Sequence, residues 1–126
     1  MHVFTYGSLM FPEVWLRVTG QPGVALAARL DGYARYAVSG VSYPGIVAEL
    51  GSVAGVLYLD VTPEALARLD RFEGNEYLRR EVVVTCENDI QLVAQAYVWR
   101  ERERLAGEAW NPDVFDLQAF LSAYCQ

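Results

Sequence analysis

The sequence predicts an α+β fold in which a small, mostly antiparallel sheet, strongly curved or barrel-like, carries a few helices. Predicted strands outnumber predicted helices, and most of them come in pairs separated by short turn sequences, which favours hairpins. The chain has 126 residues, of which 53% are hydrophobic. That length and composition suit a single domain, residues 1–126, with one buried core.

The first predicted elements are a strand and a short helix. The strand runs from Val3 to Tyr6, and the helix runs from Pro12 to Val18, because proline is favoured at an early helical position. Two hairpins are expected to follow. Their predicted strands and turns are Val24 to Leu30 and Tyr33 to Val38 around Asp31-Gly32, then Ile46 to Glu49 and Val53 to Val61 around Gly51-Ser52.

A helix from Pro63 to Glu73 has the clearest signals. Thr62 can cap its N-terminus, and Gly74 is the expected C-terminal breaker. Turn residues, charge and apolar spacing predict the remaining elements. These are a hairpin of Leu78 to Thr85 and Leu92 to Trp99 around Asn88-Asp89, a solvated charged stretch from Arg100 to Gly107, and a last helix from Val114 to Tyr124 with Asp113 as candidate cap.

Charge and composition argue against several classes of function. The net charge is −6, with ten arginines and no lysine, so we expect no nucleic-acid partner and no lysine Schiff base. The sequence has no secretory signal pattern and no apolar run of membrane-spanning length, so we expect no membrane partner. Cys86 and Cys125 are expected to be reduced thiols in a cytoplasmic protein. One histidine and two distant cysteines predict no metal site.

Tyr6-Gly7-Ser8-Leu9 is the most informative stretch of the chain. A predicted strand ends here in a glycine turn, and Pro12 opens a helix soon afterwards. Such a turn can point several backbone N–H groups at one spot, and a helix N-terminus adds positive potential. The loop is therefore a candidate site for a carboxylate or a developing oxyanion. The alternative is an ordinary strand-to-helix turn, because short glycine motifs are weak signals.

Glu73 is the candidate general base. With Leu66 and Leu69 it occupies positions i, i+3 and i+7 of the predicted helix, so it lies at the end of an apolar stripe. Partial burial and the negative end of the helix dipole both raise the pKa of a carboxyl group. A raised pKa suits proton transfer near neutral pH. The alternative is a glutamate that reaches the surface or pairs with an arginine.

Several short motifs occur together and in a characteristic order. They are Gly7-Ser8-Leu9, Tyr43-Pro44-Gly45-Ile46-Val47, Gly55-Val56-Leu57-Tyr58, Leu69-Asp70-Arg71-Phe72-Glu73-Gly74 and Tyr77-Leu78-Arg79. Each motif alone is unspecific, but the ordered set resembles the gamma-glutamylcyclotransferase-like family, in its AIG2-like branch. The resemblance runs from about Val3 to Trp99.

The resemblance implies a fold, a reaction and roles for residues. The fold would be a small mixed barrel with flanking helices. Tyr6 to Leu9 would bind the glutamyl moiety through backbone groups, and Glu73 would be the general acid/base. The α-amine of a γ-glutamyl group would attack its own γ-carbonyl and release 5-oxoproline and a free amine or amino acid. The reaction would need no cofactor or metal.

Other side chains are weaker candidates. The aromatic residues that could line the pocket, or simply pack in the core, are Tyr6, Tyr43, Tyr77, Tyr97 and Trp99. Arg79 could orient a substrate carboxylate or pair with a structural acid such as Asp70, which ranks second as the base. A serine relay through Ser8 has little support, because the sole histidine, His2, lies near the first residue.

Three functions remain open. The first is an enzyme that acts on a small γ-glutamyl substrate. The second is a non-catalytic domain that binds an acidic metabolite in the same pocket, and the third is an interaction module without a ligand. The leaving amine could belong to a γ-glutamyl amino acid, a γ-glutamyl amine, a γ-glutamyl-lysine isopeptide or a biosynthetic intermediate, whereas glutathione is disfavoured. The sequence carries no signal for the oligomeric state.

Overall fold

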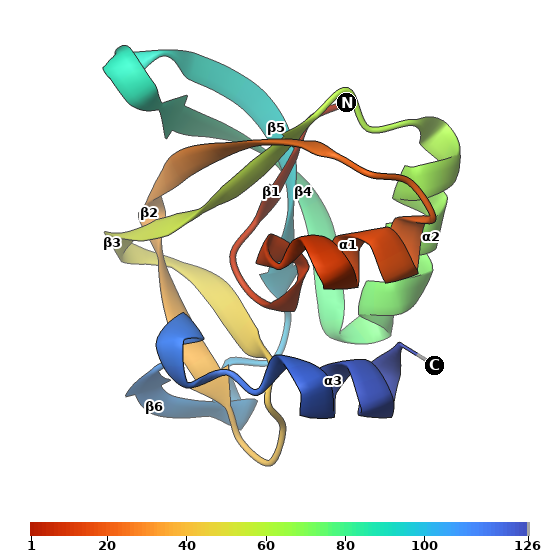
Figure 1. The fold of residues 1–126 in the computed structure, drawn as a ribbon. Coiled ribbons are helices and arrows are strands. Elements are labelled where there is room, and N and C mark those ends of the chain that lie inside the picture. Colours follow the sequence, from red (N-terminus) through yellow and green to blue (C-terminus); the bar gives the residue numbers. More distant parts are fainter. Residues whose placement is uncertain (126) are drawn as a thin grey trace.

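A computed structural model of the protein describes residues 1–125. In this part of the chain, five strands close into a barrel, and a sixth strand extends one of them (Figure 1). The strands are β1 (Val3–Thr5), β2 (Val24–Val38), β3 (Pro44–Leu59), β4 (Tyr77–Cys86), β5 (Gln91–Trp99) and β6 (Leu105–Ala109). The barrel order is β3-β1-β5-β4-β2, and β2 pairs again with β3. The predicted α+β class with a mostly antiparallel barrel is confirmed.

Strand β1 makes the one parallel pairing within residues 1–125. It pairs antiparallel with β3, with Val3 opposite Tyr58, and parallel with β5, with Val3 opposite Gln95. Two hydrogen bonds to the residues before β1 extend these pairings: Gln95 N–H donates to the His2 carbonyl at 2.8 Å, and Val61 N–H donates to the Met1 carbonyl at 2.7 Å. The three residues of β1 thus connect β3 to β5 and close the barrel.

The two hairpins expected between Val24 and Val61 are instead one long hairpin, so this prediction is wrong. Strands β2 and β3 pair along their whole length, and the connection lies at residues 39–43. The register shifts between Asp31, which faces Ser52, and Tyr33, which faces Ala48. Gly32 has a φ of +83° at this shift. Gly32 and Gly51, which the sequence suggested as turn residues, therefore mark a bulge that bends the hairpin. Glycine is favoured in bulges as well as in turns.

Three helices flank the barrel in the described residues: α1 (Pro12–Thr19), α2 (Pro63–Glu73) and α3 (Leu117–Tyr124). Helix α2 begins and ends as predicted, and the Thr62 hydroxyl accepts from Ala65 N–H at 3.2 Å. Helix α3 begins three residues later than expected. Asp116, rather than Asp113, caps it by accepting from Ala119 N–H at 3.0 Å.

The charged stretch after β5 is mostly exposed, as expected, but its last residues begin a strand that the sequence did not predict. Residues Arg102–Arg104 form a 3-10 turn, but Leu105–Ala109 form β6, which pairs antiparallel with β2. Strand β6 is mostly exposed and contains Gly107, so its sequence shows no alternation of apolar and polar residues. The predicted hairpin of β4 and β5 is confirmed, with its turn at Glu87–Asp89.

The helices cover one side and one end of the barrel. Helices α1 and α2 lie side by side, and the indole of Trp15 in α1 stacks on Tyr58 of β3 with ring centroids 3.7 Å apart. Helix α3 lies below them in Figure 1, where Phe120 packs against Phe72 of α2. Leu66 and Leu69 are buried on the face of α2 that packs against the core. This packing fixes the end of α2, and therefore Glu73, against the barrel.

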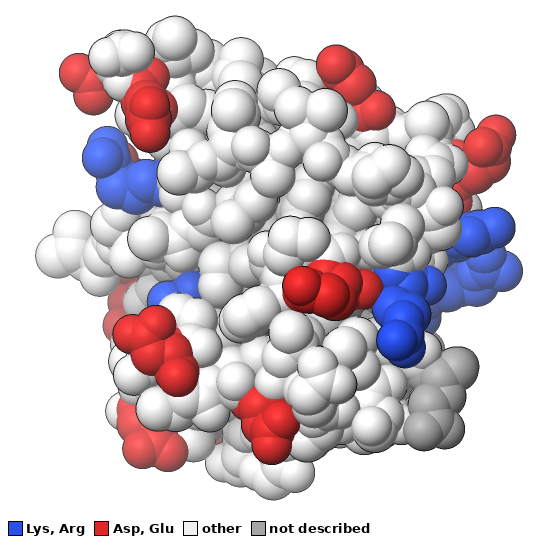
Figure 2. Space-filling view, viewed as in Figure 1, with Lys and Arg blue, Asp and Glu red and all other residues white. Residues whose placement is uncertain are grey.

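Charged side chains are distributed unevenly. Figure 2 shows acidic groups scattered over the viewed face and basic groups mainly on the side of α1 and α2. Three arginines on that side, Arg17, Arg68 and Arg71, line one open cleft. Arg68 donates to the Thr19 carbonyl at 3.3 Å and Arg17 to the Cys125 carbonyl at 3.4 Å, so two of them stabilise the C-terminal ends of α1 and α3.

The expectations about the membrane and about the cysteines can be compared with single features of the structure. None of the helices in residues 1–125 combines the length and the apolar character that crossing a membrane requires. Cys86 and Cys125 are both free thiols. The cytoplasmic location stays a prediction.

Candidate functional site

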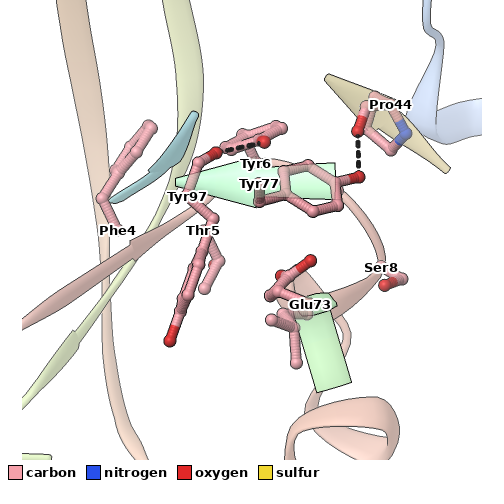
Figure 3. Close-up of a pocket in the computed structure, with 10 residues that line it drawn as sticks. Phe4, Thr5, Tyr6, Ser8, Pro44, Glu73, Tyr77 and Tyr97 are labelled. Carbon is pink, nitrogen blue, oxygen red and sulfur yellow. Dashed lines mark hydrogen bonds between the residues drawn. The ribbon is translucent and has the colours of Figure 1, made fainter. Parts of the chain in front are cut away.

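A narrow pocket lies where the loop after β1 meets the end of α2 (Figure 3). Its cavity volume is about 30 Å³, enough for one or two water molecules. The lining residues are Phe4, Thr5, Tyr6, Gly7, Ser8, Leu9, Pro44, Glu73, Tyr77 and Tyr97. The structure thus brings together seven of the candidate site residues, namely the whole Tyr6 to Leu9 loop, Glu73, Tyr77 and Tyr97.

The loop residues that line the pocket carry backbone N–H groups without an acceptor in the described residues. Ser8–Met10 form a 3-10 turn, in which Met10 N–H donates to the Gly7 carbonyl at 3.0 Å. The N–H groups of Gly7, Ser8 and Leu9 donate to no other group within residues 1–125. Free N–H groups at the wall of a cavity are suited to bind an oxyanion or a carboxylate.

Gly7 is required by close packing rather than by a left-handed backbone. Its φ is −132°. A Cβ atom at this position would lie 2.8 Å from both Cδ and Cγ of Pro44, which is too close for any side chain. Pro44 therefore supports the loop from the start of β3.

Glu73 faces the loop from the last turn of α2 (Figure 3). Its side chain is partly buried and makes no hydrogen bond or ion pair with another described residue. Removal from water raises the pKa of the carboxyl group to about 8, and repulsion by Glu76 adds to the shift. A carboxyl group in this state can exchange a proton near neutral pH.

Three tyrosines hold the walls of the pocket in place. The Tyr6 hydroxyl donates to the Tyr97 carbonyl at 2.5 Å, and the Tyr77 hydroxyl donates to the Pro44 carbonyl at 2.7 Å. Burial raises the pKa of both hydroxyls well above the usual value. Tyr97 donates to Oδ1 of Asp70 at 2.7 Å. All three hydroxyls are therefore neutral and already bonded, so they act as a frame.

Two predicted binding residues lie outside the pocket. The Nε of Arg79 lies 3.1 Å from Oδ1 of Asp70, and its Nη1 donates to the Gln95 amide oxygen at 3.2 Å. This is the structural pairing that the sequence left open. Tyr43 points to a neighbouring cleft, where its hydroxyl donates to Oε1 of Glu76 at 3.0 Å.

That neighbouring cleft adjoins the pocket at Glu73 and Tyr77. Its volume is about 290 Å³. Glu73 and Tyr77 line both spaces, so their side chains form the boundary between them. The other lining residues of the cleft are Tyr43, Phe72, Gly74, Asn75, Glu76, Phe120 and Tyr124.

The sequence reasoning missed one charged residue beside the loop. Nη1 of Arg35, in β2, donates to the Tyr6 carbonyl at 2.7 Å and to the Ala54 carbonyl at 3.3 Å. Arg35 lies within a strand that has no distinctive motif, so only the fold brings it to the loop. Within residues 1–125, no group of three His, Cys, Asp or Glu side chains is placed to hold a metal ion.

The raised pKa of Glu73 predicts that stability falls with rising pH. The folded state keeps this proton up to about pH 8, whereas the ordinary pKa of a glutamate is 4.5, so the folded state binds more protons between these limits. The free energy of unfolding should therefore decrease across this window, by at most about 1.4 kcal/mol per pH unit. Thermal melting between these limits measures the slope. Glu73→Gln is the control, because it lacks this contribution, and equal slopes in both proteins would contradict the prediction.

Comparison with known proteins finds similarity to one family along most of the chain. Residues 3–112 match the family described as gamma-glutamyl cyclotransferase, AIG2-like. AIG2-like protein A of Arabidopsis thaliana is 34% identical over 116 residues, which cover 90% of this chain and 66% of the relative. Protein AIG2 C of the same organism is 35% identical over 114 residues, covering 87% of this chain and 68% of the relative. The chain thus spans about two thirds of the length of these relatives.

Solved structures share the fold. A solution structure of an Arabidopsis thaliana protein matches with a TM-score of 0.77 and 32% identity, covering 98% of this chain and 78% of that one. A structure described as gamma-glutamyl cyclotransferase matches with a TM-score of 0.68 and 20% identity, covering 79% of this chain and 66% of that one. At that identity the second match shows the fold alone.

Proposed function

Because the chain belongs to the AIG2-like gamma-glutamyl cyclotransferase family, we propose that it cyclises the γ-glutamyl group of a small substrate, releasing 5-oxoproline and a free amine or amino acid. The observation that carries the proposal is the position of Glu73. An unpaired carboxyl group with a pKa of about 8 lines the same narrow pocket as Gly7, Ser8 and Leu9, whose N–H groups are unpaired in the described residues. A proton acceptor and an oxyanion site are what this reaction needs.

The reaction consists of one bond made and one broken. The α-amine nitrogen attacks the γ-carbonyl carbon, and Glu73 accepts the proton that this nitrogen loses. The carbonyl oxygen becomes an oxyanion, which the loop N–H groups stabilise. When the tetrahedral intermediate collapses, the bond to the leaving nitrogen breaks and Glu73 returns the proton to that nitrogen. Nucleophile and electrophile belong to one molecule, so the protein mainly has to fold the substrate and exclude water.

The substrate must enlarge the pocket when it binds. A cavity of about 30 Å³ is too small for a glutamyl group, whereas the adjoining cleft has about 290 Å³. Tyr77 is held by its bond to Pro44, but Glu73 has no partner in the described residues, so Glu73 is the side chain that can move. The glutamyl group would then lie against the loop, and the leaving amine in the cleft.

The alternative function, a non-catalytic domain that binds an acidic metabolite, accounts less well for Glu73. Backbone capture of a carboxylate does not require a second carboxyl group opposite, and an ionised Glu73 would repel the ligand. A binding domain would gain affinity from an uncharged side chain at this position.

A panel of γ-glutamyl compounds tests the proposed function. The protein is incubated with γ-glutamyl amino acids, γ-glutamyl amines and the γ-glutamyl-lysine isopeptide, and 5-oxoproline is measured by mass spectrometry. At least one compound should yield 5-oxoproline and the free amine in equal amounts, faster than in a control without protein. Binding of 5-oxoproline without turnover of any compound would favour the non-catalytic domain.

A further inference from the structure

Arg35 donates a hydrogen bond to the peptide group between Tyr6 and Gly7. No step of the proposed reaction involves Arg35. We propose that Arg35 is a positioning residue: it holds and polarises this peptide group so that the Gly7 N–H becomes a strong donor to the oxyanion. The inference rests on the proposed function. Its basis is a short, charge-assisted hydrogen bond, 2.7 Å long, from Nη1 of Arg35 to the Tyr6 carbonyl.

In the described residues, Arg35 is held by backbone carbonyls rather than by a carboxylate. Arg29, Arg79, Arg102 and Arg104 all form ion pairs with carboxylates, but Arg35 has no carboxylate within 4.0 Å. It is also half-buried, and loss of water lowers its pKa. Burying an unpaired cation is costly, so the two backbone carbonyls that it contacts carry the compensation.

The geometry of a peptide group places the Gly7 N–H on the side opposite Arg35. Within residues 1–125 all peptide bonds are trans, so the carbonyl and the N–H of one unit point in opposite directions. With Arg35 bonded to the Tyr6 oxygen, the Gly7 N–H points away from Arg35. Gly7 lines the pocket, and its N–H has no other partner among the described residues. A cation bonded to the oxygen withdraws electrons from the unit and strengthens the N–H as a donor.

The segment after β6 gives this unit its outer support. The guanidinium of Arg35 lies over the indole ring of Trp110, 5.3 Å from its centroid. Trp110 is itself fixed, because its Nε1–H donates to the Ser42 carbonyl at 2.8 Å. Trp110, directly after β6, thus holds Arg35 against the loop.

Two measurements on Arg35→Gln test the proposal. The oxyanion exists only after attack, so kcat should fall about 10–100-fold while KM changes far less. The amide signal of Gly7 in a proton–nitrogen NMR spectrum should move upfield, because the peptide group loses its polarising cation. Arg80→Gln is the matched control, since Arg80 is exposed and has no ion pair in the described residues. It should change neither quantity.

Each outcome of the test supports or overturns the proposal. A folded Arg35→Gln protein with wild-type kcat, or with an unmoved Gly7 signal, overturns it. A raised KM with unchanged kcat also overturns it, because that pattern indicates a merely structural contact. If Arg35→Gln does not fold, the neutral variant Arg35→Met is used with the same criteria: a lowered kcat with an upfield shift of the Gly7 signal supports the proposal, and an unchanged kcat overturns it. If wild type turns over no γ-glutamyl compound, the proposed function fails, and the Gly7 signal still decides whether Arg35 polarises the peptide group.

Discussion

Glu73→Gln is expected to give a folded protein that binds 5-oxoproline but no longer cyclises its substrate. Glutamine keeps the shape of the side chain and removes the group that exchanges the proton, so the rate should fall by about 10²–10⁴-fold. The loop that would hold the ligand is unchanged. Stability should be maintained at low pH and should exceed that of wild type near pH 8, because burying an ionised Glu73 is what costs free energy. Turnover, together with thermal melting with and without 5-oxoproline, measures all three properties.

Asp70→Asn is the matched control for this variant. Asp70 lies on the same helix, but its carboxylate accepts from Tyr97 and pairs with Arg79 outside the pocket. We expect this change to lower stability modestly and to leave most of the activity. Near wild-type turnover in Glu73→Gln combined with loss in Asp70→Asn would show that the base is assigned to the wrong residue. Unfolding of Glu73→Gln would instead show that Glu73 is a structural partner.

Gly7→Val is expected to abolish binding of both substrate and 5-oxoproline. The new Cβ would lie 2.8 Å from the ring of Pro44, and a proline ring cannot turn away as a flexible side chain can. The loop must therefore move, which displaces the N–H groups of Gly7, Ser8 and Leu9 together. Overpacking of this kind also costs about 1–3 kcal/mol of stability. Isothermal titration with 5-oxoproline and a thermal melt measure the two effects.

Ser8→Ala is the control for the loop. The Ser8 hydroxyl makes no hydrogen bond with a described residue, and the proposed contacts use backbone groups, so this variant should keep binding and most of its activity. If Ser8→Ala proved as damaging as Glu73→Gln, a covalent route through the serine hydroxyl would have to replace the general-base mechanism.

Local signals in the sequence were sufficient where the structure depends on neighbours along the chain. Thr62, Pro63 and Gly74 fix both ends of α2, and the spacing of Leu66, Leu69 and Glu73 correctly placed the carboxyl group at the end of a buried stripe. The loop after β1 was found for the same reason. These two segments contain the core of the candidate site.

Features that depend on distant contacts were predicted less well. Gly32 and Gly51 resemble turn residues, and only the pairing of β2 with β3 shows that they mark a bulge. Strand β6 is recruited by the edge of β2 and has almost no apolar pattern of its own. Arg79 and Tyr43 belong to motifs near the pocket, but their side chains point to Asp70 and Glu76. Barrel closure, too, came from the family resemblance rather than from the hairpins.

The three residues of β1 connect segments that lie far apart in the sequence. Val3 must find Tyr58 on one side and Gln95 on the other, so both pairings close long stretches of chain. Closing such loops costs entropy before any contact offsets it, and folds rich in distant contacts fold slowly. Among the barrel strands, β1 leaves the ribosome first, yet it cannot be paired on both edges until β5 has been synthesised. Because β1 leads into the Tyr6 to Leu9 loop and β5 supplies Tyr97, a nascent chain cannot complete the pocket before β5 has been synthesised.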